Sequence, residues 1–260
     1  MKTDNHTRPH LSLLLAALAF SILIWVVSLW FQPAGYLLYP FRIFATFIHE
    51  GSHALLTVLT GGSVQSLTVS PDGSGAVNSL SNGGVSLLLI ASAGYLGTTI
   101  FGLALLLWLR LNWSSTMALR LLTILMALLT AIFGFISPLT SNFISISFYS
   151  WAFTLISGTI LSLLLALAFK LLSRKWADFL LALIATQTLL SAIFDLMNVF
   201  FITAFTNAHS DAANMAVASG IPAIFWVLLW IFIATVIIFI GLRIYAYKSI
   251  SAEDSLFQEN

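Results

Sequence analysis

Seven long apolar segments limit most strongly what this chain can fold into. They lie at about residues 11–31, 40–60, 84–111, 116–136, 151–172, 176–205 and 221–247. A helix of about 20 apolar residues is long enough to cross the hydrocarbon core of a bilayer. Charged residues make up 7% of the chain, whereas a soluble domain carries about a quarter. We therefore predict an all-α polytopic membrane protein, with six or seven transmembrane helices in a single domain over residues 1–260.

The distribution of charge predicts the orientation and excludes one class of partner. The net charge is +1 and the Lys and Arg residues are scattered, so no nucleic-acid surface is expected. The connections at about 61–83, 138–149 and 206–217 contain no Lys or Arg. Because Lys and Arg accumulate in cytoplasmic loops, we expect these three connections to face the outside.

This orientation leaves two topologies open. Seven crossings place the amino terminus outside, and six crossings with a re-entrant segment at 40–60 place it inside. In both, segment 11–31 is expected to be a retained helix and not a cleaved signal peptide, because no small-residue cleavage site follows it. We expect an integral protein of a prokaryotic plasma membrane.

The segment at 40–60 contains His49-Glu50-Gly51-Ser52-His53, an H-E-x-x-H motif. In a helix the two histidines are one turn apart and project from nearly the same face. They can bind one metal ion, while Glu50 serves as a base toward water. The chain has no cysteine, so a metal must be held by His and carboxylate groups, which suits zinc. The alternative is that both histidines are buried and hydrogen-bonded to neighbouring groups without binding a metal. Burying three ionisable groups in so apolar a helix is costly, however.

The connection at about 63–82 is expected to form a short β-hairpin. Apolar and polar residues alternate over 64–70 and again over 75–80, as in half-buried strands. Pro71-Asp72-Gly73-Ser74 between them is a dense turn signal. Such a hairpin would pack against the motif helix or line the entrance to its site. An ordinary surface loop is the alternative.

The segment at 84–111 carries small residues at four-residue spacing, Gly94, Thr98 and Gly102. Small residues on one helix face let two backbones approach closely. We therefore expect this helix to press against the motif helix.

A tetrahedral zinc site needs a third protein ligand, and Asp195 is the first candidate. It belongs to a polar line on one helix face, formed by Gln187, Ser191, Asp195 and Asn198. A rise of about 1.5 Å per residue puts Asp195 at a depth similar to that of the histidines. Asp211 or His209, in the following loop, is the alternative ligand if that loop folds inward. Asp195 would then be a carboxyl group hydrogen-bonded within the bundle.

These motifs resemble those of the site-2 protease group of intramembrane zinc metallopeptidases, in particular its short branch without accessory domains. The resemblance covers about residues 40–105 and 190–230. Its pieces are His49-Glu50-Gly51-Ser52-His53-Ala54, Thr60-Gly61-Gly62, Ser70-Pro71-Asp72-Gly73-Ser74-Gly75, Ala93-Gly94-Tyr95-Leu96-Gly97, Phe194-Asp195, and Ser210-Asp211-Ala212 with Trp226 and Trp230 beyond. It implies one zinc ion per chain held by His49, His53 and Asp195, with Glu50 as the catalytic base.

The chain departs from the group where other members carry an Asn on the helix after the hairpin. It has Gly94-Tyr95-Leu96-Gly97-Thr98 there. We expect Tyr95, Thr98 and Asn198 to support the substrate or the oxyanion instead.

The leading hypothesis from the sequence is an intramembrane zinc endopeptidase whose partners are the lipid bilayer and a membrane protein substrate. A metal-binding membrane regulator without proteolysis is the first alternative. A small-solute or ion transporter is the second, because polar residues at membrane depth also suit transport. The substrate and the oligomeric state stay open.

Overall fold

The computed structural model describes residues 9–141, 146–206 and 210–257 of the chain. The elements in chain order are α1 (Pro9–Trp30), the 3-10 helix η1 (Gln32–Leu37), α2 (Tyr39–Leu59), β1 (Ser63–Val69), β2 (Gly75–Leu80), α3 (Val85–Arg110), α4 (Ser115–Leu128), the π-helix η2 (Leu129–Ile136), α5 (Ser137–Thr140), α6 (Phe148–Leu171), α7 (Arg174–Phe205), α8 (Asp211–Ser219) and α9 (Ala223–Phe257).

Six helical stretches in the described part of the chain are long and apolar enough to cross a membrane. They belong to α1, α3, the continuous run of α4, η2 and α5, and to α6, α7 and α9. The predicted all-α membrane fold with six or seven spans and a short hairpin is therefore confirmed. The motif helix α2 is not among the six, because Arg42, His49, Glu50 and His53 make it less apolar.

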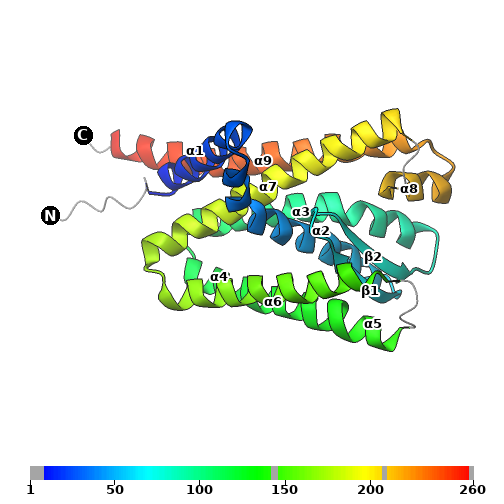
Figure 1. Ribbon diagram of the computed structural model, residues 1–260. Coiled ribbons are helices and arrows are strands. Elements are labelled where there is room, and N and C mark those ends of the chain that lie inside the picture. The colour runs from blue at the N-terminus through cyan, green and yellow to red at the C-terminus, as the bar shows by residue number, and fades with distance from the viewer. Residues whose placement is uncertain (1–8, 142–145, 207–209, 258–260) are drawn as a thin grey trace.

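The long helices lie side by side, and the two ends of the bundle differ (Figure 1). The hairpin and α8 lie at one end, whereas the connection from α6 to α7 lies at the other. At the second end, α7 begins with Arg174 and Lys175. The functional residues described below therefore lie away from this cluster of positive charge.

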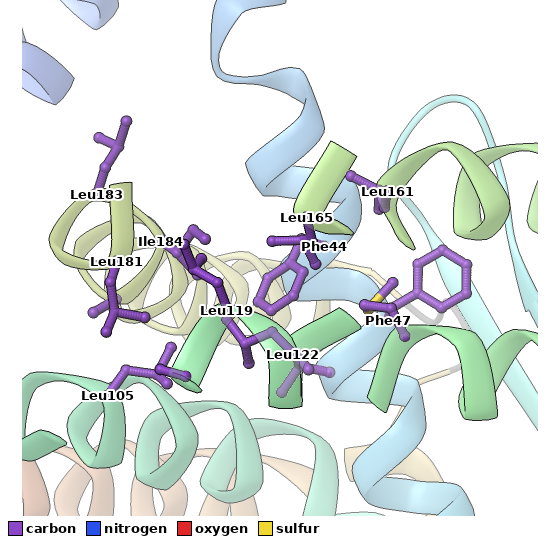
Figure 2. Packing of buried hydrophobic residues seen from close by; sticks show 14 of the residues in the cluster. Phe44, Phe47, Leu105, Leu119, Leu122, Leu161, Leu165, Leu181, Leu183 and Ile184 are labelled. Atoms are coloured by element: carbon purple, nitrogen blue, oxygen red, sulfur yellow. The ribbon is translucent and has the colours of Figure 1, made fainter. Parts of the chain in front are cut away.

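The apolar core lies between α2, α3, α4, α6 and α7 (Figure 2). Its labelled side chains are Phe44, Phe47, Leu105, Leu119, Leu122, Leu161, Leu165, Leu181, Leu183 and Ile184. On α2, Phe44 and Phe47 lie on the face turned away from His49 and His53, as 100° per residue requires. One face of α2 therefore anchors the helix in the bundle and leaves the other face free for chemistry.

α3 packs against α2, as its small residues predicted. A Cβ atom on Gly97 would collide with Ser52, and one on Gly94 would collide with both histidine rings. Gly102 faces α7, where a Cβ atom would lie 2.8 Å from Cγ of Leu189. The small residues of α3 therefore serve two helix contacts, one with α2 and one with α7.

The predicted hairpin is present, with β1 and β2 paired antiparallel from Val69 and Gly75 at the turn to Ser63 and Leu80 at the open end. β1 faces the bundle, and Leu67 and Val69 are fully buried. Near the turn, the N–H of Val69 donates to Oγ1 of Thr154 on α6 at 2.7 Å. The hairpin is thus held through β1, while residues of β2 line a cavity beside α2.

Candidate metal centre

Two histidines of α2 and one aspartate of α8 come together at the hairpin end of the bundle. The Nε2 atoms of His49 and His53 lie 3.9 and 3.5 Å from Oδ2 of Asp211. One ligand atom from each residue lies within 4.8 Å of the other two. Bonds of about 2.1 Å to a tetrahedral zinc ion would separate its ligand atoms by about 3.4 Å. The three side chains therefore fit one metal ion.

The third member of this group is the alternative ligand Asp211 and not the first candidate, Asp195. Asp195 lines the same cavity but is not among the residues whose ligand atoms meet. The chain beyond α7 turns back, so that α8 brings Asp211 beside the histidines, as the alternative required. His209 lies outside the described residues. Asp211 therefore replaces Asp195 as the candidate third ligand.

α8 has clear local signals at both ends. The hydroxyl of Ser210 accepts a backbone N–H from the first turn at 3.2 Å, which is an N-cap. Gly220 ends the helix in the left-handed conformation, with φ 72°. Met215 is buried next to Trp230 of α9 in a second apolar cluster. The caps were readable from the sequence, but the packing that turns Asp211 inward was not.

Asp211 is held in its ionised form. Burial alone would raise the pKa of this carboxyl, but the neighbouring His49 and His53 side chains lower it well below its usual range. A carboxylate is the form that binds a divalent metal. The electrostatics therefore agree with a ligand role.

Neighbouring groups orient both imidazole rings. Nδ1 of His53 donates to the carbonyl of Ile90 at 2.6 Å, which leaves its Nε2 lone pair free for a metal. The ring of His49 lies edge-on to Tyr95, with centroids 4.7 Å apart. Tyr95 in turn stacks on Trp230 at 5.0 Å. The ligand atoms are thus positioned before any metal binds.

Two glycines allow backbone to approach the motif. Gly94 of α3 lies directly against Nε2 of His49 and His53, where a methyl group would collide with both. Gly75 of β2 lies against Glu50, and a Cβ atom there would be 2.6 Å from Cγ and Oε1. Glu50 is 6% exposed. The hairpin therefore forms one wall around the predicted base.

A cavity of about 840 Å³ opens beside these groups, between α2, the hairpin, α3, α7 and α8. Tyr95, Asp195 and Asn198 line it, together with both histidines and Glu50. Thr98 does not, because it is fully buried and donates to the carbonyl of Gly94 in its own helix at 2.7 Å. Of the three residues expected to support the substrate, Tyr95 and Asn198 therefore line the cavity and Thr98 does not.

The predicted polar line on α7 divides into two parts. Gln187 donates to Oγ of Ser21 on α1 at 2.7 Å, so it serves a helix contact. Asp195 and Asn198 line the cavity. Gln187 therefore belongs to the contact between α7 and α1, whereas Asp195 and Asn198 belong to the cavity beside the histidines.

Comparison with known proteins adds one match. The model of the Peptidase M50B-like family matches residues 13–241. The chain belongs to this family. The M50B-like match confirms the resemblance to site-2-protease-like metallopeptidases. No curated protein and no solved structure matched the chain.

The M50B-like region contains the whole of the site. It includes the H-E-x-x-H motif, the hairpin, the cavity-lining part of α7 and the ligand candidate Asp211. The family points to a membrane metallopeptidase and to zinc as its metal.

Proposed function

We propose that this M50B-like protein is an intramembrane zinc endopeptidase that cleaves a membrane-spanning or membrane-associated protein. One observation carries the proposal. His49, His53 and Asp211 converge within 4.8 Å, and Glu50 lines the same cavity. A site that only bound metal would need the three ligands but no carboxylate beside them.

The residues present fit zinc. Two imidazoles and one carboxylate form a nitrogen and oxygen donor set of the kind found in catalytic zinc sites, which keep one position open. Gly94 leaves room at the two Nε2 atoms. A bound zinc ion supplies Lewis acidity, which makes water acidic enough to act as a nucleophile near neutral pH. One zinc ion per chain is proposed.

The chain's own residues supply the proton transfers and the orientation. Glu50 accepts the proton of the attacking water and later donates it to the leaving amine. Tyr95 lines the cavity next to His49, and we propose that its phenol O–H donates to the substrate carbonyl oxygen. Asn198 offers an amide from the opposite wall, on α7.

The hairpin supplies a place for an extended substrate. Peptide bonds of a helix are protected by their own hydrogen bonds, so a substrate helix must unwind before cleavage. β2 is the strand whose residues line the cavity, whereas β1 is tied to Thr154 of α6. We propose that an unwound substrate adds to β2 as a third strand.

The test compares the purified wild type with Glu50→Gln on a mixture of transmembrane peptides in detergent, with cut positions read by mass spectrometry. Glu50→Gln should retain one zinc per chain and lose at least about 100-fold in cleavage rate. Glu253→Gln, the same chemical change near the carboxyl terminus, is the control. Equal cleavage by the wild type and Glu50→Gln would disprove the proposal.

A further inference from the structure

Arg42 lies on the face of α2 that carries the metal ligands. It precedes His49 by seven residues and His53 by eleven, which at 100° per residue puts all three side chains within about 40°. The rise of the helix separates Arg42 from His49 by about 10 Å along the axis. Arg42 lines the cavity that contains the histidines and Glu50. Among the described residues that line this cavity, Arg42 is the one Lys or Arg.

The guanidinium of Arg42 is held against the hairpin turn. A Cβ atom on Gly73 would lie 2.5 Å from Nε of Arg42. The turn itself is fixed to α2, because Oγ1 of Thr46 donates to the carbonyl of Gly73 at 2.9 Å. The phenol of Tyr39 donates to the carbonyl of Pro71 at 2.7 Å. Arg42 therefore has a defined place beyond the end of β2.

The donors of this guanidinium are not used within the described part of the protein. Asp72 is directed toward its own turn, since its Oδ1 accepts from the backbone N–H of Ser74 at 2.9 Å and from its hydroxyl at 2.7 Å. No hydrogen bond or ion pair joins Arg42 to another described residue. Asp195 also lines the cavity, without a contact to Arg42 within ion-pair distance. Arg42 is exposed at this cavity, and the guanidinium of an Arg that has no hydrogen-bond partner in the protein suits an incoming carboxylate.

We infer that Arg42 determines specificity by binding the carboxylate of an Asp or Glu side chain in the substrate. This inference rests on the proposed peptidase function. A strand rises about 3.3 Å per residue, so 10 Å corresponds to about three residues of an extended substrate. β2 runs from the Arg42 end of the hairpin to its open end. A substrate paired antiparallel to β2 runs toward Arg42, so the acidic residue lies about three positions after the cleaved bond.

The test uses a library of transmembrane peptides with randomised residues, and the products are sequenced to give residue frequencies around each cut. The wild type should enrich Asp and Glu over Asn and Gln about tenfold, two to four positions after the cut. Arg42→Gln should abolish this enrichment, and Arg42→Glu should replace it by Lys and Arg. Arg120→Gln, whose guanidinium lies over Phe169 outside the cavity, should keep the wild-type profile.

Three results would overturn the inference. One is a wild-type profile that is flat for acidic residues at these positions. Another is a profile that Arg42→Glu leaves unchanged. The third is that Arg42→Gln lowers the cleavage rate of every peptide equally, by a factor that depends on the content of anionic phospholipid. This result would assign Arg42 to a lipid phosphate. Failure of the peptidase proposal looks different, because the wild type would then cleave no more than Glu50→Gln.

A binding measurement separates recognition from catalysis. The measurement gives the dissociation constants of two peptides for the Glu50→Gln protein. The peptides differ only at the third position after the preferred cut, where one has Asp and the other Asn. The Asp peptide should bind about tenfold more tightly, and the double variant Arg42→Gln, Glu50→Gln should bind both equally. Equal binding of the two peptides to the Glu50→Gln protein would contradict the inference.

Discussion

At the scale of single residues, two aspartates in one cavity have different positions relative to the histidines. Asp211 reaches the Nε2 atoms of both rings, whereas Asp195 stays outside the group of meeting ligand atoms. Asp195 comes from the wall formed by α7, and Asp211 comes from a helix that folds over the cavity. Zinc binding can therefore decide which of the two aspartates is a ligand.

Removal of each aspartate should affect zinc differently. Asp211→Ala should lower zinc below about one tenth of one ion per chain, because it deletes a proposed ligand. Asp195→Ala should keep nearly full zinc. Zinc is measured by elemental analysis after gel filtration, with His49→Ala as the positive control for loss. Full zinc in Asp211→Ala, or loss in Asp195→Ala, would restore Asp195 as the third ligand.

At the scale of elements, α3 and β2 approach the motif helix from two sides, each through a glycine. Gly94 faces the metal-binding nitrogens, and Gly75 faces the carboxylate of Glu50. The two contacts therefore divide the site into a part that binds the metal and a part that transfers protons. Substitution by alanine can separate these parts.

Gly94→Ala should displace the histidine rings and weaken zinc binding by about 10- to 100-fold. Gly75→Ala should keep the zinc and lower the cleavage rate, since it displaces Glu50 alone. Zinc affinity and cleavage rate are measured for both. Gly35→Ala is the matched control, because its Cβ atom would have an ordinary 3.6 Å contact with Ser28. Parallel losses of zinc in Gly94→Ala and Gly75→Ala would contradict this division.

At the scale of the whole molecule, the site lies at the opposite end of the bundle from Arg174 and Lys175 (Figure 1). Arg174 and Lys175 are the first two residues of α7, next to its connection with α6, whereas the connection that contains the hairpin has no Lys or Arg. Because positive residues are retained in the cytoplasm, the hairpin end should face the outside.

Cysteine labelling tests this orientation cleanly, because the chain contains no cysteine. Asn82 follows the hairpin and Ser173 precedes α7, and both are exposed. On intact cells, a maleimide that cannot cross the membrane should label Asn82→Cys. It should label Ser173→Cys only after permeabilisation. The reverse pattern would show that the site opens to the cytoplasm.

Much of the fold was predictable because it depends on neighbours in the sequence. Apolar segments of spanning length became α1, α3, α6 and α7 with nearly the expected ends, whereas α9 continues to Phe257, about ten residues beyond its expected end at about 247. Alternation around a turn-forming segment became the hairpin. α8 was missed, although Ser210 and Gly220 mark its ends, because a nine-residue helix between two long spans resembles a polar loop.

The sequence by itself determined the membrane class, the hairpin and the pair of ligands on α2, since the helical repeat alone puts His49 and His53 on one face. Only the tertiary structure decided that Asp211 joins them, that β2 lines the cavity, and that Arg42 lies there without a partner among the described residues. The physical reason is the distance along the sequence between the residues that determine each feature. Helix length and side-chain direction follow from local geometry, whereas these three features depend on how α8, the hairpin and α3 pack around α2.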